Sequence, residues 1–126
     1  MSPESHARSA VLRHALLELH RLIVAFERAD YERRAGEGNA AAFLRILVED
    51  EAYAWLRPLS ALIVQMDEET ETPAAGAEST LLDETRALLK PDPAGTPFQA
   101  RYAWLIEQSP DVAYAHGAVV QVLKSR

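Results

Sequence analysis

The chain has 126 residues, of which 48% are hydrophobic and 25% are charged, and its formal net charge is −6 at pH 7. This composition can fill an apolar core, and it excludes an intrinsically disordered chain. The apolar run of residues 22–26 is far shorter than the roughly 20 residues that a membrane span needs, so we expect no membrane association. The length is that of one domain, and we expect residues 1–126 to fold as a single unit.

The sequence contains no cysteine, which excludes disulfides, thiol nucleophiles and cysteine-based zinc sites. Its start lacks the basic segment and apolar stretch of a signal peptide. Eleven arginines against two lysines, together with abundant alanine, are typical of a GC-rich bacterial genome. We therefore expect a cytoplasmic bacterial protein.

Negative charge is concentrated in one part of the chain. Residues 37–72 carry a net charge of −6, whereas residues 1–36 and residues 96–126 carry +1 each. The acids that alternate with the N-terminal arginines are Glu18, Glu27, Asp30 and Glu32. Such alternation is typical of a solvated helix face. Because no basic face for phosphate contacts is present, we do not expect nucleic-acid binding.

Three helix starts are marked by capping signals. Residues 2–4 and 109–111 each read Ser-Pro-acid, which places a capping hydroxyl before a proline at the first helical position. The acid that follows faces the positive end of the helix dipole. Thr96 and Gln99 form the pattern of a capping box, so we expect a third start there.

Residues 3–35 are predicted to form one long helix. Its apolar seam, with alternating steps of four and three, consists of Leu12, Leu16, Leu19, Ile23 and Phe26. Glycines at 36 and 38 end it. Asn39 then caps a short helix that reaches about residue 49. The inward residues expected in this helix are Phe43, Leu44, Leu47 and Val48.

Residues 50–71 contain Pro58 within an apolar-periodic stretch that begins at a capping Asp50. The periodicity keeps its phase across the proline, so we expect one helix, kinked near residues 54–58, where Pro58 removes a hydrogen bond to Ala54. A break at Arg57 is the alternative, because a residue before proline avoids the helical region.

The remainder of the chain predicts three further helices. A loop at residues 72–78 leads to a helix at 79–90, and a turn at 91–97 leads to a helix that ends near 108. A last helix follows Pro110. The inward residues of these helices are Leu81, Leu82, Leu88, Leu89, Phe98, Tyr102, Leu105, Ile106, Val112, Val119, Val120 and Leu123. Strand-type alternation is absent, so the predicted fold is an all-α bundle of four to six helices.

The strongest candidate binding residues are Trp55, Arg57 and His116. An aromatic ring, a guanidinium and the gap opened by a proline could together hold an anion or an aromatic side chain. The alternative is structural: Trp55 fills the bend, and Arg57 binds freed carbonyl groups or an acid. We favour the structural interpretation, and we expect His116 to be a partly buried packing residue.

The acidic segment 67–71 lies at the end of a predicted helix and is either a solvated terminus or a docking site for a basic protein partner. His14 and Glu18 have the i, i+4 spacing of metal ligands, and His20 and His116 could join them. The sequence has neither His-Glu-x-x-His nor paired Glu-x-x-His motifs, so we expect no metal and no other cofactor.

Two segments, AWLRPLSALIVQMDEE and FQARYAWLIEQSPDVAYAHGAVVQVL, resemble those of an uncharacterised family of small all-helical bacterial proteins. In that family a stretch F-x-WLRPLS-x-LI occurs, and here Tyr53 stands at the phenylalanine position. The resemblance implies a helical fold. It implies no reaction and transfers no catalytic residue.

No nucleophile elbow surrounds Ser60 or Ser109, and no glycine-rich loop could hold a phosphate, so no catalytic residues are assigned. We expect a non-enzymatic interaction or regulatory protein. The alternative is a bundle that binds a small molecule or metal and could be an enzyme. A homodimer is also expected, with Leu17, Tyr31 and Trp104 available for its interface.

Overall fold

The structure, a computed structural model, describes residues 3–36, 38–72 and 75–124. These residues form six α-helices and one 3₁₀ helix, and no strand, so the predicted all-α fold is confirmed. The elements in chain order are α1 (Pro3–Ala35), α2 (Ala40–Glu49), η1 (Glu51–Leu56), α3 (Arg57–Glu71), α4 (Ala77–Leu88), α5 (Pro97–Gln108) and α6 (Pro110–Lys124).

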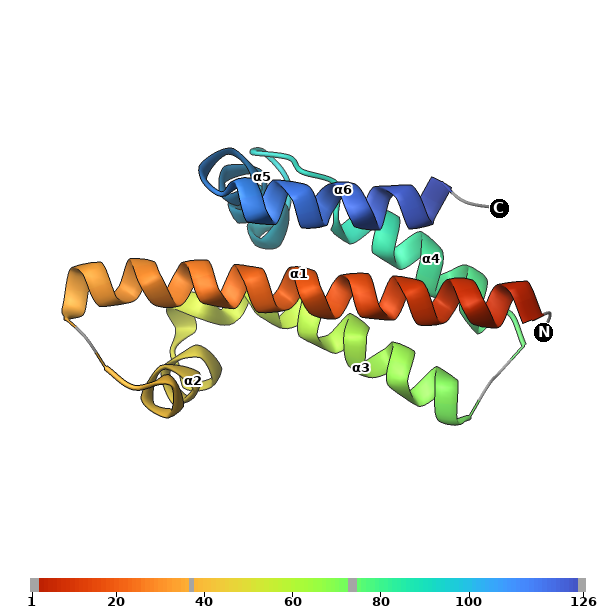
Figure 1. Cartoon of the computed structure of the whole chain (residues 1–126), viewed down its shortest axis with the longest axis horizontal. Helices are drawn as coiled ribbons and strands as arrows, with labels where there is room; N and C mark the ends of the chain where they lie inside the picture. The colour runs from red at the N-terminus through yellow and green to blue at the C-terminus, as the bar shows by residue number, and fades with distance from the viewer. Residues whose placement is uncertain (1–2, 37, 73–74, 125–126) are drawn as a thin grey trace.

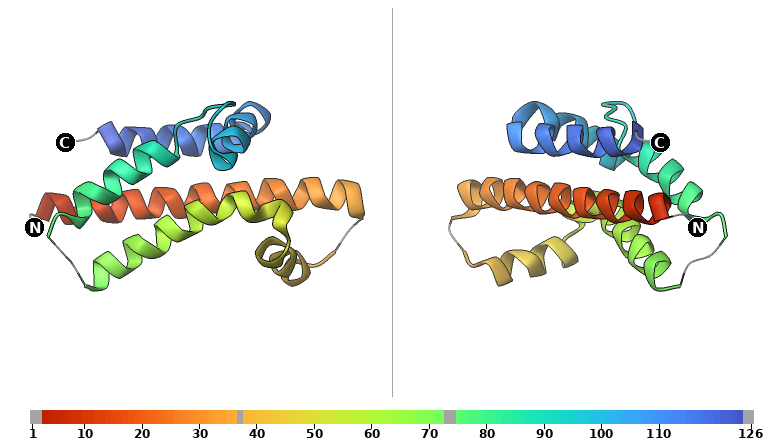
Figure 2. Two further views of the ribbon diagram at one scale, coloured as in Figure 1. Left: turned by 180° about the vertical axis from the view of Figure 1, so that it is seen from behind. Right: turned by 45° about the vertical axis from the view of Figure 1, so that its right-hand side comes forward.

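The long helix α1 is the axis of the molecule, as its sequence predicted. It packs most extensively on α6, which runs antiparallel to it, so that the two chain ends lie on the same side (Figure 1). Helices α2 and α3 lie along the opposite side of α1 and diverge from each other (Figure 2). Helix α4 crosses between α3 and the layer formed by α5 and α6.

Local signals explain where the helices begin and end. Gly36 has φ +90°, a left-handed conformation that suits glycine, and its N–H donates to the carbonyl of Glu32 at the end of α1. Asn39 caps α2, and Thr96 forms the predicted capping box with Gln99. The capping hydroxyl expected at Ser2 lies outside the described residues. Helix α4 begins and ends two residues earlier than predicted. It ends before Lys90, because a residue that directly precedes a proline, here Pro91, disfavours the helical conformation.

The segment around Pro58 changes helix type. Residues 51–56 are a 3₁₀ helix and α3 begins at Arg57, whereas we expected α-helix on both sides of a kink. The helical path is still continuous, because Leu56 and Arg57 both have right-handed helical φ and ψ. The N–H of Arg57 donates to the carbonyl of Ala54, the group that Pro58 cannot serve. The proline therefore occupies the first turn of α3, where its missing N–H costs nothing.

The core is one cluster of apolar side chains. Its buried members come from η1 and from every α-helix except α2. Its fully or almost fully buried members include Leu12, Leu16, Leu19, Ile23, Leu56, Leu59, Leu62, Phe98, Tyr102, Leu105, Val112 and Val119. The seam of α1 is confirmed as far as Ile23. Its next buried residue is Glu27 and not Phe26, which is only half-buried against the cluster.

Helix α2 attaches to this body mainly through aromatic contacts. Phe43 packs between Tyr31 and Tyr53, with ring centroids 5.6 Å apart in both pairs. Leu44 and Val48, which we expected to point inward, are 53% and 69% exposed. That expectation was wrong: Phe43, Ile46 and Leu47 form the inward side of α2, and Leu44 and Val48 lie on the flank of its apolar face that is nearer Arg45.

Candidate functional site

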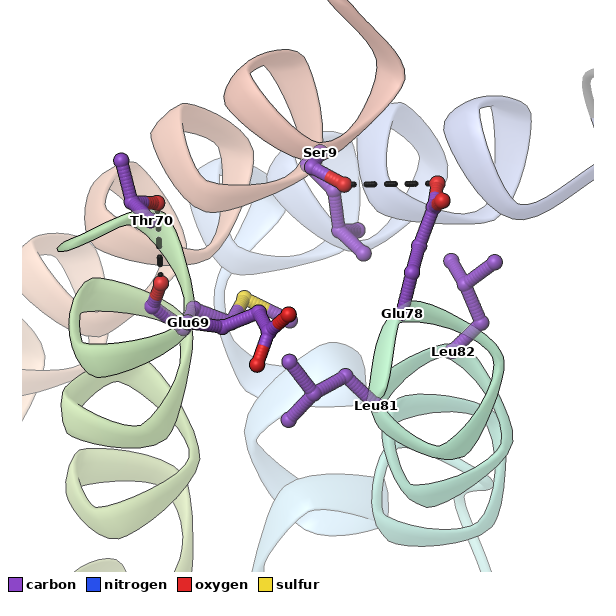
Figure 3. A pocket seen from close by; sticks show the side chains of 8 residues that line it. Ser9, Glu69, Thr70, Glu78, Leu81 and Leu82 are labelled. Carbon is purple, nitrogen blue, oxygen red and sulfur yellow. Dashed lines mark hydrogen bonds between the residues drawn. The ribbon is translucent and has the colours of Figure 1, made fainter. Parts of the chain in front are cut away.

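The clearest pocket lies between α1, α3 and α4 (Figure 3), at the end of the molecule where α3 diverges from α1 (Figure 1). It has a cavity volume of about 40 Å³. Its lining residues are Ser9, Leu12, Met66, Glu69, Thr70, Glu78, Leu81 and Leu82. Apolar side chains form the floor, and hydroxyl and carboxylate groups form the rim. The pocket can therefore hold an apolar group that carries a polar or cationic end.

The two glutamates of the rim come from different helices. Glu78, in the first turn of α4, accepts a hydrogen bond from Ser9 at 3.4 Å and pairs with Arg8 at 3.5 Å. Glu69 extends from α3 toward α4 across the pocket (Figure 3). The hydroxyl of Thr70 donates to the carbonyl of Met66 at 3.0 Å, so it is held within its own helix. The carboxylates are the groups of this rim that can receive a cation.

The acidic segment predicted at residues 67–71 forms one wall of this region. Asp67 pairs with Arg13 across α1 and α3. A second, open hollow on the α3–α4 seam is lined in part by Glu69, Leu81 and Glu84. Glu69 and Leu81 border both hollows, so the pocket continues onto an acidic surface.

Trp55 and Arg57 do not form a common corner. Trp55 is half-buried against Phe98, with ring centroids 6.1 Å apart. Arg57 is exposed, pairs with Glu51 at 3.6 Å and donates to the carbonyl of Val48 at 3.3 Å. The ion pair with Glu51 agrees with the structural interpretation of Arg57, whereas the carbonyl that Arg57 binds belongs to Val48 and is not one that Pro58 frees.

His116 is partly buried, as the sequence predicted, and packs against Tyr102 of α5. Its Nδ1 lies 2.6 Å from the hydroxyl oxygen of Tyr102, and the two rings meet edge to face. Burial lowers the pKa of His116 and raises the pKa of Tyr102, so both side chains are uncharged at neutral pH. The contact gives each of these two polar side chains a hydrogen-bond partner.

A buried ion pair that the sequence did not predict joins α1 to α5. Glu27 is 1% exposed, and its carboxylate accepts three hydrogen bonds of 2.8–3.0 Å from Arg101. The guanidinium of Arg101 lies 4.1 Å from the ring centroid of Trp104, which in turn meets Phe26 edge to face. Burial raises the pKa of Glu27 above its ordinary value, and Arg101 offsets part of that rise.

The placement of Glu27 on a solvated face was therefore wrong. The available signal was the spacing of the α1 seam: a step of four from Ile23 reaches Glu27, whereas we continued with a step of three to Phe26. In the sequence, the partner Arg101 stands out only as a charged residue next to the apolar residues of the segment RYAW. Because Arg101 lies 74 positions away, no local pattern could connect the two residues.

A serine–histidine contact was also not anticipated. Nε2 of His20 on α1 lies 3.1 Å from Oγ of Ser60 on α3. Burial lowers the pKa of His20. The described contacts place no carboxylate on its other ring nitrogen, and Ser60 lies within a helix and not on an exposed turn. The pair links two helices and lacks the orienting group of a catalytic triad.

His14 and Glu18 have the spacing of metal ligands, but Glu18 is engaged by another residue. Glu18 accepts two hydrogen bonds from Arg21, its neighbour on the same face of α1. This pairing lowers the pKa of Glu18. Within the part of the chain that the structure describes, no group of three or more histidine or acidic residues could hold a metal ion.

No protein-family model, curated protein or solved structure matches this chain. The helical fold implied by the resemblance of residues 54–69 and 98–123 is confirmed, while these comparisons identify no family. None of the described helices has both the length and the apolar character required to cross a bilayer.

Proposed function

We propose that this is a non-enzymatic interaction protein that binds a basic segment of a partner protein at the pocket between α1, α3 and α4. The observation that carries the proposal is the position of an apolar pocket directly beside the acidic segment 67–71. A bound segment would place one apolar side chain in the pocket and its lysine or arginine neighbours against the surrounding carboxylates.

The size of the pocket favours a single side chain over a free ligand. Sites for small molecules and cofactors typically enclose about 300–1,000 Å³. The enclosed cavity here is about 40 Å³ and the open hollow that adjoins it is about 440 Å³, so only the enclosed part is too small for such a molecule. One aliphatic side chain supplied by a peptide needs much less room, and the peptide backbone can remain on the open surface.

Charge around the pocket favours a basic partner. The acids of this region are Asp67, Glu68, Glu69, Glu71, Glu78 and Glu84, and its arginines are Arg8, which pairs with Glu78, and Arg13, which pairs with Asp67. The net charge of this set is −4. The C-terminal end of the α3 dipole adds further negative potential. A cationic segment is therefore attracted before it makes contact, and salt should slow its association.

The proposal is tested with a labelled synthetic peptide that alternates lysine with leucine, followed by fluorescence anisotropy. Glu69→Gln removes a rim charge, and Ser9→Phe fills the pocket. A hydrogen bond to a charged group contributes about 1.5–3 kcal/mol, so we expect Glu69→Gln to raise Kd roughly tenfold or more. Matched controls are Glu107→Gln and Ser79→Phe, which change exposed side chains that do not line the pocket.

Two further peptides separate anchoring from simple charge attraction. Replacing leucine by serine removes the anchor, and replacing lysine by glutamate reverses the charge; each change should abolish specific binding. Equal binding of the serine and leucine peptides would contradict the proposal, because the apolar pocket would then have no role. Unchanged affinity for the lysine–leucine peptide in both Glu69→Gln and Ser9→Phe would also contradict the proposal.

A further inference from the structure

A second apolar hollow lies on the seam between α3 and α4, next to the start of α5, and we call it the Pro58 hollow. Its volume is about 370 Å³. Its apolar lining residues are Pro58, Leu62, Ala87 and Leu88, and its polar lining residues are Gln65, Glu84, Thr96 and Gln99. Leu62 is 4% exposed, whereas Pro58 and Ala87 are exposed, so the hollow reaches from the core to the surface. It is therefore open to a side chain from outside the chain.

The Pro58 hollow is connected to the pocket along the seam. The open hollow beside the pocket shares Glu69 and Leu81 with the pocket, and it shares Gln65 and Glu84 with the Pro58 hollow. Helix α4 packs on α3 and runs back alongside it (Figure 2), so the three hollows follow one another along the seam. The seam thus has an apolar site at each end and polar side chains between them.

Helix geometry gives the spacing of the two apolar sites. From the pocket to the Pro58 hollow, the lining residues of α4 shift by about six positions, as from Leu82 to Leu88, and those of α3 by about seven, as from Glu69 to Leu62. Because an α-helix rises about 1.5 Å per residue, both helices place the two sites roughly 9–10 Å apart along the seam.

This spacing favours a helical occupant over an extended one. An α-helix that lies on the seam presents residues i and i+7 on one face, about 10.5 Å apart. An extended segment presents a side chain to the same face at every second residue, at about 6.6 Å and about 13 Å, so neither spacing matches the two sites.

The charge of the seam indicates which residues should lie between the two apolar side chains. Among the described residues that line the three hollows, every charged one is a glutamate: Glu69, Glu78 and Glu84. Positions i+3 and i+4 of a docked helix lie on the same face as i and i+7 and midway between them. Lysine or arginine at these two positions is therefore placed against Glu69 and Glu84, in the middle of the seam.

We propose that the partner segment is a basic amphipathic α-helix that lies along the α3–α4 seam. Its apolar residue i enters the pocket, its apolar residue i+7 enters the Pro58 hollow, and basic residues at i+3 and i+4 face Glu69 and Glu84. The pattern is symmetric, so either direction of the helix satisfies it. This inference rests on the proposed function, because it takes the pocket as the first site, and it adds a second site and the conformation of the partner.

Three labelled alanine-based peptides of about 18 residues, long enough to form a helix, test the spacing by fluorescence anisotropy. All have leucine at i and lysine at i+3 and i+4. The first has a second leucine at i+7, the second has it at i+5, which turns it away from the seam, and the third has alanine at both positions. Because burial of a leucine side chain is worth about this much, the first peptide should bind roughly tenfold more tightly than the other two.

The outcomes separate this inference from the proposed function. Equal affinity of the three peptides overturns the helix with two apolar contacts but leaves the single pocket in place. Binding of the alternating lysine–leucine peptide as tight as that of the first peptide, or tighter, overturns the helical conformation and supports the proposed function. If no peptide binds, both proposals are overturned.

Ala87→Gln tests where the second leucine binds, because it places a polar side chain in the Pro58 hollow. Ala87 is exposed and glutamine is a good helix former, so the circular dichroism spectrum should be unchanged. The variant should lose the roughly tenfold advantage of the first peptide and should bind the single-leucine peptide as wild type does. The matched control is Ala61→Gln, which is exposed on α3 and lines none of the three hollows. An advantage that persists in Ala87→Gln, or that is lost equally in Ala61→Gln, overturns the second site.

Discussion

Of the arginine–carboxylate pairs that connect α1 to neighbouring helices, those of Arg101 with Glu27 and of Arg13 with Asp67 lie in opposite environments. In the pair of Arg101 with Glu27 the side chains are 32% and 2% exposed, whereas in the pair of Arg13 with Asp67 they are 40% and 44% exposed. The first carboxylate has no access to water and depends on its partner; the second keeps a hydration shell. Burial, and not the number of ion pairs, should therefore decide how much each residue matters.

The largest effect is expected from Arg101→Met. This change leaves the Glu27 carboxylate buried without a cation, which costs about 3–5 kcal/mol. It also removes the cation–π contact with Trp104. Urea unfolding followed by circular dichroism measures the loss. The control is Arg21→Met, which breaks an exposed pair with Glu18 and should cost less than about 1 kcal/mol.

A double variant separates the two causes of that loss. If the unpaired charge dominates, replacing both partners, in Glu27→Met with Arg101→Met, should restore most of the free energy of unfolding, because methionines of similar volume can pack in the same space. A double variant as unstable as Arg101→Met alone would show instead that the packing of Arg101 on Trp104 is the larger contribution. The difference in stability contribution between the two ion pairs would then arise from packing and not from charge.

The same contrast shows what the sequence could and could not predict. Helix starts at Thr96 and Ser109 depend on groups within three residues, so they were predictable, and the structure has both caps. The position of Glu27 depends on whether the α1 seam continues by three or four residues, and on an arginine in another helix. A single helix of period 3.6 permits either step, so only the packing of α5 decides it.

The candidate site was predictable only in part. The acidic segment 67–71 was identified from charge, but Ser9 and Glu78 come from helices far apart in the sequence, and no spacing rule relates them to Glu69. Leu44 and Val48 show a different limit. Phe43 was correctly predicted as an inward residue, but Leu44 and Val48 lie on the flank of the apolar face, and the aromatic partners that fix the orientation of α2 belong to other elements.

A smaller effect on the free energy of unfolding is expected from the protonation of Glu27. The sign of its pH dependence tests whether the pKa of Glu27 is raised or lowered in the folded protein. Burial raises its pKa in the folded state above the ordinary value of 4.5. The folded protein therefore binds this proton more tightly than the unfolded chain does. Stability from this group is fully present below pH 4.5 and is lost as pH rises through the folded-state pKa.

Glu27→Gln removes that dependence and provides the comparison. As pH falls toward 4.5, the free energy of unfolding of wild type should rise relative to that of Glu27→Gln, measured by urea unfolding at a series of pH values. The opposite slope would mean that Arg101 holds the pKa of Glu27 below its ordinary value, so that pairing outweighs burial even at this position.

The smallest effect is expected at the surface pair. Asp67→Asn removes the charge that faces Arg13 but leaves both side chains hydrated, so the free energy of unfolding should fall by only about 0.2–1 kcal/mol. Because salt screens half-exposed charges, the difference from wild type should shrink as ionic strength rises, whereas the loss in Arg101→Met should persist. A salt-independent loss comparable to that of Arg101→Met would show that Arg13 and Asp67 act as a buried pair does. Exposure of the carboxylate would then no longer explain why one arginine is essential to the fold and the other is not.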